Sequence, residues 1–246
     1  MTSDGFELKS VTKKYGETTA LDGVSFTASR RESTAILGPS GCGKSTVLRL
    51  LAGLEVPTNG RILLDDKVVS ETGRVVTPPH RRGVSLVFQD LALWPNLSIL
   101  DNVVLGLSGL RLSKKEAETR ARKTLTLCSI ESLADRKPGG VSGGQEQRAA
   151  LARALAPEPA FLLLDEPFSG RDLGTKKKLL EDIANLSSER KITTVLVTHD
   201  PQEARTLCGR AIVLRDGRLE ELGSWSDLLE SPRSDILRLF REHLGT

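Results

Sequence analysis

Residues 38–45 have the sequence GPSGCGKS, and this stretch decides the fold of the chain. It fits the G-x-x-x-x-G-K-[ST] pattern of a phosphate-binding loop, which needs a strand before it and a helix after it. The apolar residues 33–37 predict that strand, and residues 46–52 predict the helix. Because both flanks agree, an ordinary glycine-rich turn is the weaker alternative. Phosphate contacts are therefore predicted at Gly38, Pro39, Ser40, Gly41, Cys42, Gly43, Lys44, Ser45 and Thr46.

A second motif follows an uninterrupted apolar run at residues 161–164 (FLLL) and consists of Asp165 and Glu166. Such a run predicts a buried parallel strand, and open parallel sheets bind ligands at the C-terminal ends of their strands. We expect Asp165 to hold Mg²⁺ together with the Ser45 hydroxyl, and Glu166 to orient and deprotonate an attacking water. The alternative is an acidic helix cap before Pro167.

Two further motifs point to the same ligand. The apolar run at residues 193–198 ends at His199, which can donate a hydrogen bond to a γ phosphate, although a single histidine is more often structural. Residues 142–145 (SGGQ) open a helix predicted over residues 145–156, and a helix N-terminus attracts anions. The chain therefore carries two predicted anion sites.

In this order and spacing, the motifs resemble those of the ATP-binding cassette (ABC) family, the motor subunits of ABC transporters, over nearly the whole chain. The resemblance implies ATP and Mg²⁺ as ligands, with Tyr15 stacked on adenine and Gln89 touching Mg²⁺ or the attacking water. It identifies Ser142, Gly143, Gly144 and Gln145 as the family signature. The implied catalytic residues are Glu166, His199, Gln89 and Lys44, and the implied Mg²⁺ ligands are Ser45, Gln89 and Asp165.

The fold implied by this resemblance is α/β: a P-loop NTPase with a RecA-like parallel-sheet core, an antiparallel β edge subdomain and an inserted helical lobe. Its 246 residues suit one such domain. Strands at residues 6–11, 24–28 and 61–64 are predicted for the antiparallel sheet. Ser113 is predicted to cap a helix of the lobe. Asp216 and the glycine after it are predicted to form a hairpin turn. The predicted divisions of this single domain are 1–92 with 158–220 for the core and β subdomain, 93–157 for the lobe and 221–246 for a helical tail.

Composition excludes several protein classes. The net charge is +3, 27% of residues are charged and 38% are hydrophobic, and no apolar run approaches the ~20 residues of a membrane span. The basic clusters at 30–31, 81–82 and 176–178 are short and scattered, so we expect them on a solvated surface. With only 4% aromatic residues, the chain lacks the pattern of a nucleic-acid platform.

The ends and the cysteines support an intracellular expectation. The first residues lack a basic start and an apolar leader, so we expect a cytoplasmic protein, and the short amphipathic tail at 235–243 predicts no large regulatory domain. Three widely spaced cysteines predict neither a zinc site nor a disulfide framework. Cys42 lies next to a predicted helix N-terminus, which is expected to lower its pKa and make the thiol reactive.

Two segments bear on partners. Residues 91–97 (LALWPNL) are unusually apolar for the start of an exposed lobe, so they either pack inside it or, as in the resembling family, accept a coupling helix from a membrane subunit. Residues 169–172 (SGRD) contain Arg171 where the family usually has leucine. In the resembling family this segment lies between two cassettes. We therefore expect Arg171 to affect the coupling between the ATP sites of the two cassettes.

These expectations combine into the ATPase subunit of an importer-type ABC transporter. Two copies, or this chain and a related cassette, would clamp ATP between them, and hydrolysis would release them. Expected partners are transmembrane permease subunits contacting Gln89 to Leu97 and a solute-binding protein, without nucleic acid, at the cytoplasmic face of the inner membrane as a peripheral protein. The alternatives are a soluble non-transport ABC ATPase acting on a ribosome or nucleic-acid complex and a phosphoryl-transfer enzyme with a small-molecule acceptor.

Overall fold

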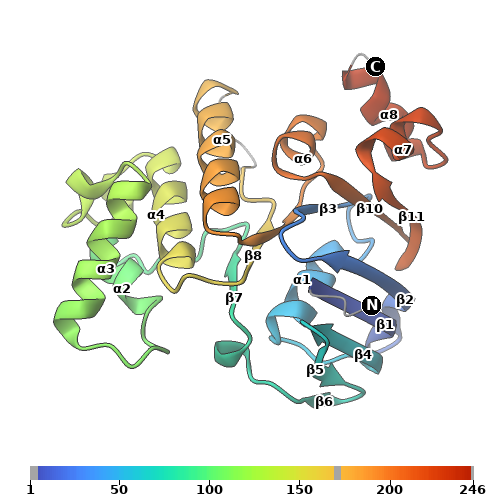
Figure 1. Ribbon diagram of the computed structural model, residues 1–246, viewed down its shortest axis with the longest axis horizontal. Helices are drawn as coiled ribbons and strands as arrows, with labels where there is room; N and C mark the ends of the chain where they lie inside the picture. Colours follow the sequence, from blue (N-terminus) through green and yellow to red (C-terminus); the bar gives the residue numbers. More distant parts are fainter. Residues whose placement is uncertain (1–4, 169–172, 245–246) are drawn as a thin grey trace.

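The computed structural model describes residues 5–168 and 173–244 of the chain. Figure 1 shows two sheets at one end, a group of helices at the other, and the C-terminal helices packed beside the larger sheet. Arg171 and its neighbours in the segment 169–172 lie outside the described residues, so the expectation for that segment is not tested.

The larger sheet contains the most apolar strands of the chain, in the order β11-β10-β3-β9-β8-β7. β10, β3, β9, β8 and β7 are parallel, and β11 pairs antiparallel with β10. The three strands predicted for this sheet are confirmed within one residue, and their C-terminal ends meet at one edge, where such sheets bind ligands. The strands are β3 (Thr34–Leu37), β7 (Val84–Val87), β8 (Phe161–Asp165), β9 (Thr193–Val197), β10 (Arg210–Arg215) and β11 (Arg218–Ser224).

The smaller sheet is antiparallel, as predicted, in the order β2-β1-β4-β5-β6. Its first two strands are longer than expected, because bulges near Val11 let the pairing continue through the polar residues that follow. Phe6 and Phe26 pack edge to face across this pair, with ring centroids 6.0 Å apart. The strands are β1 (Gly5–Tyr15), β2 (Thr18–Ser29), β4 (Asn59–Leu64), β5 (Lys67–Glu71) and β6 (Arg74–Val75).

Helix α1 (Lys44–Ala52) lies between the two sheets. Its buried residues Val47, Leu48, Leu50 and Leu51 belong to one hydrophobic cluster with residues of both sheets. The other face of the larger sheet is covered by α5 (Leu173–Glu189) and α6 (Pro201–Leu207) in a second cluster. The parallel strands are thus buried on both faces, which explains why they lack polar alternation in the sequence.

The predicted helical lobe contains α2 (Ile99–Leu105), α3 (Lys114–Leu127) and α4 (Gly143–Leu155), which lie together at the end of the molecule away from the antiparallel sheet (Figure 1). Ser113 caps α3 as predicted, in a capping box with Glu116. Short 3₁₀ turns complete this region and the preceding loop: η1 (Pro79–Arg81), η2 (Glu131–Leu133) and η3 (Pro138–Gly140).

The C-terminal region corrects one predicted boundary. The hairpin turn at Asp216 is confirmed, with φ values of 49° there and 75° at Gly217. The strand β11 that follows pairs with β10 as far as Ser224, so the helices α7 (Trp225–Glu230) and α8 (Asp235–Leu244) begin later than the predicted start at residue 221. Across the described chain, no helix combines the length and the apolar character needed to span a bilayer.

The expectation that the basic clusters are solvated is wrong for three residues. Arg82 is only 6% exposed, and its guanidinium lies against α1 and β5. Arg30 forms an ion pair with Asp65 at 2.5 Å, and Lys176 pairs with two carboxylates. Sequence adjacency of like charges did not reveal these partners, because all of them come from distant parts of the chain.

Candidate nucleotide site

The phosphate-binding loop connects β3 to α1, as predicted. Gly38, Gly41 and Gly43 have φ values of 148°, 81° and 105°. A Cβ atom at Gly43 would lie 2.5 Å from the carbonyl oxygen of Ala20, and one at Gly38 would lie 2.2 Å from that of Leu214. Both positions therefore require glycine for lack of space as well as for backbone conformation.

The loop borders a cavity of about 200 Å³ at the C-terminal edge of the parallel sheet. Lys44 is buried there, and its Nζ donates to the carbonyl oxygens of Gly38 at 2.8 Å and Pro39 at 2.9 Å. These bonds hold a positive charge at the loop, where it attracts an anion. The cavity is lined by Ser40, Gly41, Gly43, Lys44, Ser45, Thr46 and Glu166.

The two residues predicted to ligate Mg²⁺ from the loop and from β8 lie side by side. Ser45 Oγ donates a hydrogen bond of 2.9 Å to Asp165 Oδ1. Burial raises the pKa of Asp165, the hydrogen bond from Ser45 opposes this effect, and the negative charge of Glu166 adds to it. A hydroxyl and a desolvated carboxylate form the hard oxygen donor set that Mg²⁺ prefers, so these residues fit the ion.

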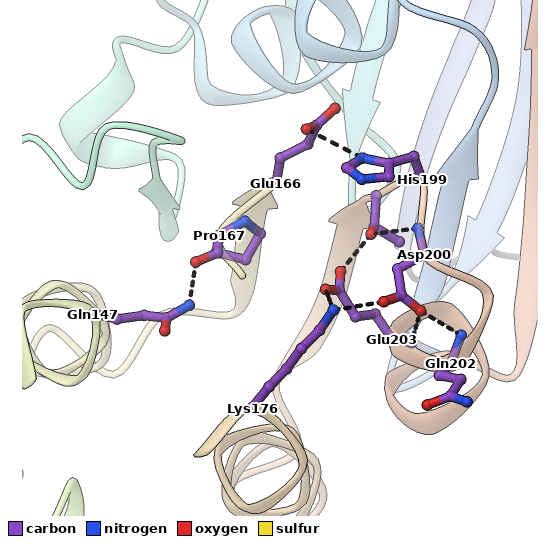
Figure 2. A network of polar contacts seen from close by, with 9 residues as sticks. Gln147, Glu166, Pro167, Lys176, His199, Asp200, Gln202 and Glu203 are labelled. Atoms are coloured by element: carbon purple, nitrogen blue, oxygen red, sulfur yellow. Dashed lines mark hydrogen bonds and ion pairs between the residues drawn. The ribbon is translucent and has the colours of Figure 1, made fainter. Parts of the chain in front are cut away.

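Glu166 and His199 come from neighbouring strands and face each other. Glu166 Oε2 lies 3.4 Å from His199 Nδ1, as Figure 2 shows. The Glu166 backbone has a φ of 43°, and its N–H donates to the carbonyl oxygen of Val197 at 2.9 Å, which directs the residue out of the strand. The His199 side chain is 69% exposed and the Glu166 side chain 23%. A carboxylate at the cavity and an imidazole beside it can orient and deprotonate a water near a bound phosphate.

Tyr15, the predicted adenine platform, lies next to the loop. Its hydroxyl donates to the Glu55 carboxylate, and Lys13 Nζ lies 4.9 Å from the ring centroid. Burial and the bond to Glu55 raise the pKa of Tyr15, while a hydrogen bond with the Thr46 side chain opposes the rise. Tyr15 remains 43% exposed, so an aromatic side chain is accessible beside the end of the phosphate-binding loop.

The signature turn is well formed but does not share this cavity. Ser142 caps α4, and its N–H donates to Gln145 Oε1 at 2.9 Å in a capping box. Among the described residues, the lining of the cavity includes neither Ser142 nor Gln145. Within one chain, the signature turn therefore lies outside the described lining of the loop cavity.

Gln89 is exposed after the end of β7 and is likewise absent from the described lining of the cavity. Val87 at the end of β7 pairs with Leu164 of β8, so Gln89 follows the same edge of the sheet as Asp165. Beyond Gln89 the chain is tied to the lobe, because Arg153 of α4 donates to the carbonyl oxygens of Leu91 and Ala92. Both of these residues have positive φ values, 60° and 45°.

The sequence left open whether the apolar segment 91–97 packs inside the lobe or is exposed to a partner, and the structure shows part of it buried and part exposed. Leu91 is buried and Leu93 packs against the core, whereas Trp94 is 58% exposed. The buried Asn102 fixes the turn, since its Oδ1 accepts from Trp94 N–H at 2.8 Å and its Nδ2 donates to the Trp94 carbonyl oxygen at 3.1 Å. The indole is thus presented outward from a rigid turn.

The expectation of a reactive Cys42 thiol is wrong. Cys42 is 3% exposed and belongs to the cluster around α1. Burial raises its pKa, and the charge of Lys44 only partly offsets this effect. The loop turns the sulfur into the core.

Sequence reasoning missed Gln147, which is 1% exposed in α4. Its Nε2 donates to the carbonyl oxygen of Pro167, the residue after Glu166 (Figure 2). A signal was present, because Gln147 lies on the same helical face as Ala150, Leu151 and Ala154, all of which are buried. A polar side chain on an apolar face needs a partner.

With this geometry established, comparison with known proteins defines the class. The ABC transporter family matches residues 21–169. The chain has a TM-score of 0.80 with a solved dimeric ATP-binding cassette, MJ0796, in a post-hydrolysis state bound to ADP and Pi; the two are 36% identical, and the match covers 89% of this chain and 98% of that one. The chain therefore belongs to the ABC transporter family.

Two similar proteins are named as import proteins. The chain is 43% identical over 239 residues to a spermidine/putrescine import ATP-binding protein, PotA, of Trichodesmium erythraeum, covering 97% of this chain and 61% of that protein. It is 44% identical over 232 residues to an Fe(3+) ions import ATP-binding protein, FbpC, of Brucella abortus, covering 94% of this chain and 64% of that protein. The chain thus spans about three fifths of the length of these relatives.

Proposed function

We propose that this chain is the ATP-hydrolysing subunit of an ABC importer. The observation that carries the proposal is the position of Glu166 on the lining of the phosphate-loop cavity, with His199 3.4 Å away and the Ser45–Asp165 pair at the edge of the same sheet. Membership of the ABC family and likeness to a cassette bound to ADP and Pi support it.

Each residue has a distinct part in the proposed reaction. The loop N–H groups and Lys44 bind the phosphates of ATP, while Tyr15 stacks on adenine. Glu166 orients the attacking water and accepts its proton, and His199 donates to the γ phosphate. Ser45 and Asp165, with Gln89 as a further ligand, would hold Mg²⁺, which would supply positive charge to the phosphate oxygens.

A dimer completes this site in the proposal. Because the signature turn of one chain lies outside its own loop cavity, we infer that Ser142, Gly143, Gly144 and Gln145 bind ATP held by a second cassette, either a copy of this chain or a related one. The structural relative described above is dimeric, which supports the arrangement. The division of the chain into core, lobe and tail belongs to the same proposal.

The partners are proposed to be transmembrane permease subunits that contact Gln89 to Leu97, together with a solute-binding protein, at the cytoplasmic face of the inner membrane. The exposed indole of Trp94 supports the contact. Relatives of nearly equal identity are named for spermidine/putrescine import and for Fe(3+) import. We infer that the residues this chain shares with them bind and hydrolyse ATP and do not select the transported solute. Co-purification with a permease would separate this proposal from a soluble cassette acting on a ribosome or nucleic acid.

Replacement of Glu166 by Gln tests the catalytic assignment. We expect the variant to bind ATP, to remain dimeric with it in size-exclusion chromatography and to lose about 100-fold or more in turnover, because the amide cannot accept the proton of the water. Phosphate release and binding of a fluorescent ATP analogue measure the two properties. The matched control is Glu242→Gln, an exposed carboxylate on α8. Near-normal turnover in the Glu166 variant would remove this residue from the proposed role.

A further inference from the structure

Three charged side chains meet next to His199: those of Lys176 in α5, of Asp200, which follows His199, and of Glu203 in α6. Lys176 Nζ, from α5, lies 2.5 Å from Asp200 Oδ2 and 2.5 Å from Glu203 Oε1 (Figure 2). The side chains of Lys176, Asp200 and Glu203 are 14%, 26% and 4% exposed, so Glu203 is buried and its two neighbours are partly shielded from solvent. Such pairs are sensitive to the removal of one partner, because an unpaired charge is then left buried.

The cluster holds both neighbours of His199. Thr198 Oγ1 donates to Glu203 Oε2 and accepts a hydrogen bond of 3.1 Å from Asp200 N–H. Asp200 itself is bonded to Lys176, and although burial opposes its charge, that hydrogen bond holds the pKa of Asp200 below its ordinary value. The backbone on each side of His199 is therefore fixed by side chains that meet at Lys176.

Helix capping alone does not account for this arrangement. Asp200 caps α6 through Oδ1, which accepts from the N–H groups of Gln202 at 2.8 Å and Glu203 at 3.3 Å. Its second oxygen, Oδ2, faces away from the cap and accepts from Lys176. A capped α6 would form without the lysine, so the bond from α5 adds a constraint on the loop that carries His199.

We propose that Lys176 is a positioning residue for ATP hydrolysis: it neutralises Asp200 and Glu203 and so holds His199 in place beside Glu166. The inference rests on the role assigned to His199 under the proposed function. Glu166 is held by the bond from its N–H to the carbonyl oxygen of Val197, and His199, two residues after Val197, is held through Lys176.

Substitution of Lys176 by Met, alone and combined with His199→Ala, tests the inference in this chain. Misplacement of a group at the reacting phosphate lowers turnover strongly, so we expect kcat for ATP to fall about 10- to 100-fold in Lys176→Met. Binding of a fluorescent ATP analogue should stay within about twofold, since the loop contacts are untouched. Lys176→Arg keeps the charge and should restore most of kcat. Lys178→Met, at an exposed position of the same helix, is the matched control.

The double variant separates positioning from a general structural role. If Lys176 acts through His199, then Lys176→Met will lower kcat no further once His199 is Ala. If the two losses multiply, Lys176 acts independently of His199 and the inference is overturned. If His199→Ala alone keeps normal kcat, the assignment of His199 in the proposed function fails instead, so the two failures are distinguishable.

A milder variant guards against loss of folding. Asp200→Asn keeps the oxygen that caps α6 and removes the charge facing Lys176. We expect a smaller fall in kcat in the same direction, again absent when His199 is Ala. An unchanged kcat in Asp200→Asn, with an unchanged melting temperature, would contradict the inference even if Lys176→Met does not fold.

Discussion

Arg82 offers a direct test of how the phosphate-loop helix is held in place. Its guanidinium donates to the carbonyl oxygens of Leu50 and Leu51 at the C-terminal end of α1, both at 3.0 Å. It also donates to the carbonyl oxygen of Val69 in β5 at 2.9 Å and to that of Thr77 at 2.8 Å. Burial lowers the pKa of Arg82 to about 10, so the side chain is still charged at neutral pH.

The expected effect of Arg82→Met follows from these acceptors. A hydrogen bond from a charged donor contributes about 1.5–3 kcal/mol. Without Arg82, the carbonyl oxygen of Leu50 keeps the N–H of Gly53 as a donor, and that of Val69 keeps the N–H groups of Val76 and Thr77. The loss therefore comes from the bonds to Leu51 and Thr77, and the low end for these two gives about 3 kcal/mol in the free energy of unfolding. For a chain of this size the melting temperature should fall by roughly 6–12 °C.

The neighbouring residue provides the control. Arg81 has the same side chain but is exposed, so Arg81→Met should change the free energy of unfolding by less than about 0.5 kcal/mol. Equilibrium denaturation in urea, followed by circular dichroism, measures both variants against the unchanged protein. If Arg82→Met is no less stable than Arg81→Met, the assignment of Arg82 as the link between α1 and β5 is wrong.

Two further predictions concern the partner surface and the antiparallel sheet. Trp94→Ala should leave basal ATP hydrolysis unchanged and uncouple it from transport in the reconstituted complex, because the indole is exposed and lies outside the described lining of the cavity; intact coupling would contradict the contact. Asp65→Asn should lower the free energy of unfolding at pH 7 by about 1 kcal/mol, since the hydrogen bond from Arg30 holds the pKa of Asp65 below 3.8. That stabilisation is present above pH 3.8 and is lost as the pH falls through the lower folded-state pKa, so the unfolding curves of the two proteins should converge in acid, and a difference that persists there would refute the pKa argument.

The features that the sequence predicted well are those set by local chemistry. Gly38 and Gly43 lie where a Cβ atom has no room, and the predicted cap at Ser113 forms with a residue three positions away. The strand before Asp165 was recognisable because burial on both faces leaves no polar alternation. In each case the feature is determined either by contacts between residues close in the sequence or by burial that is the same at every position of the strand.

The features that escaped prediction depend on partners far apart in the chain. Arg81 and Arg82 are chemically identical neighbours, yet only the second meets the end of α1. Lys176 belongs to a basic run that is typical of a solvated surface, but the fold places it against Asp200 and Glu203. Cys42 is adjacent to a helix N-terminus, yet its sulfur points into the core, so burial and not the helix determines the direction of its pKa shift.

Gln147 lies between these two cases, because its burial was predictable while its partner was not. The 3.6-residue period places it on the apolar face of α4, where its amide must find an acceptor. That acceptor is the carbonyl oxygen of Pro167, adjacent to Glu166, so one hydrogen bond joins the helix that begins at the signature to the loop that carries the proposed base. A rotation of the lobe relative to the core would therefore either break this bond, which leaves a buried amide without a partner, or move the backbone next to Glu166.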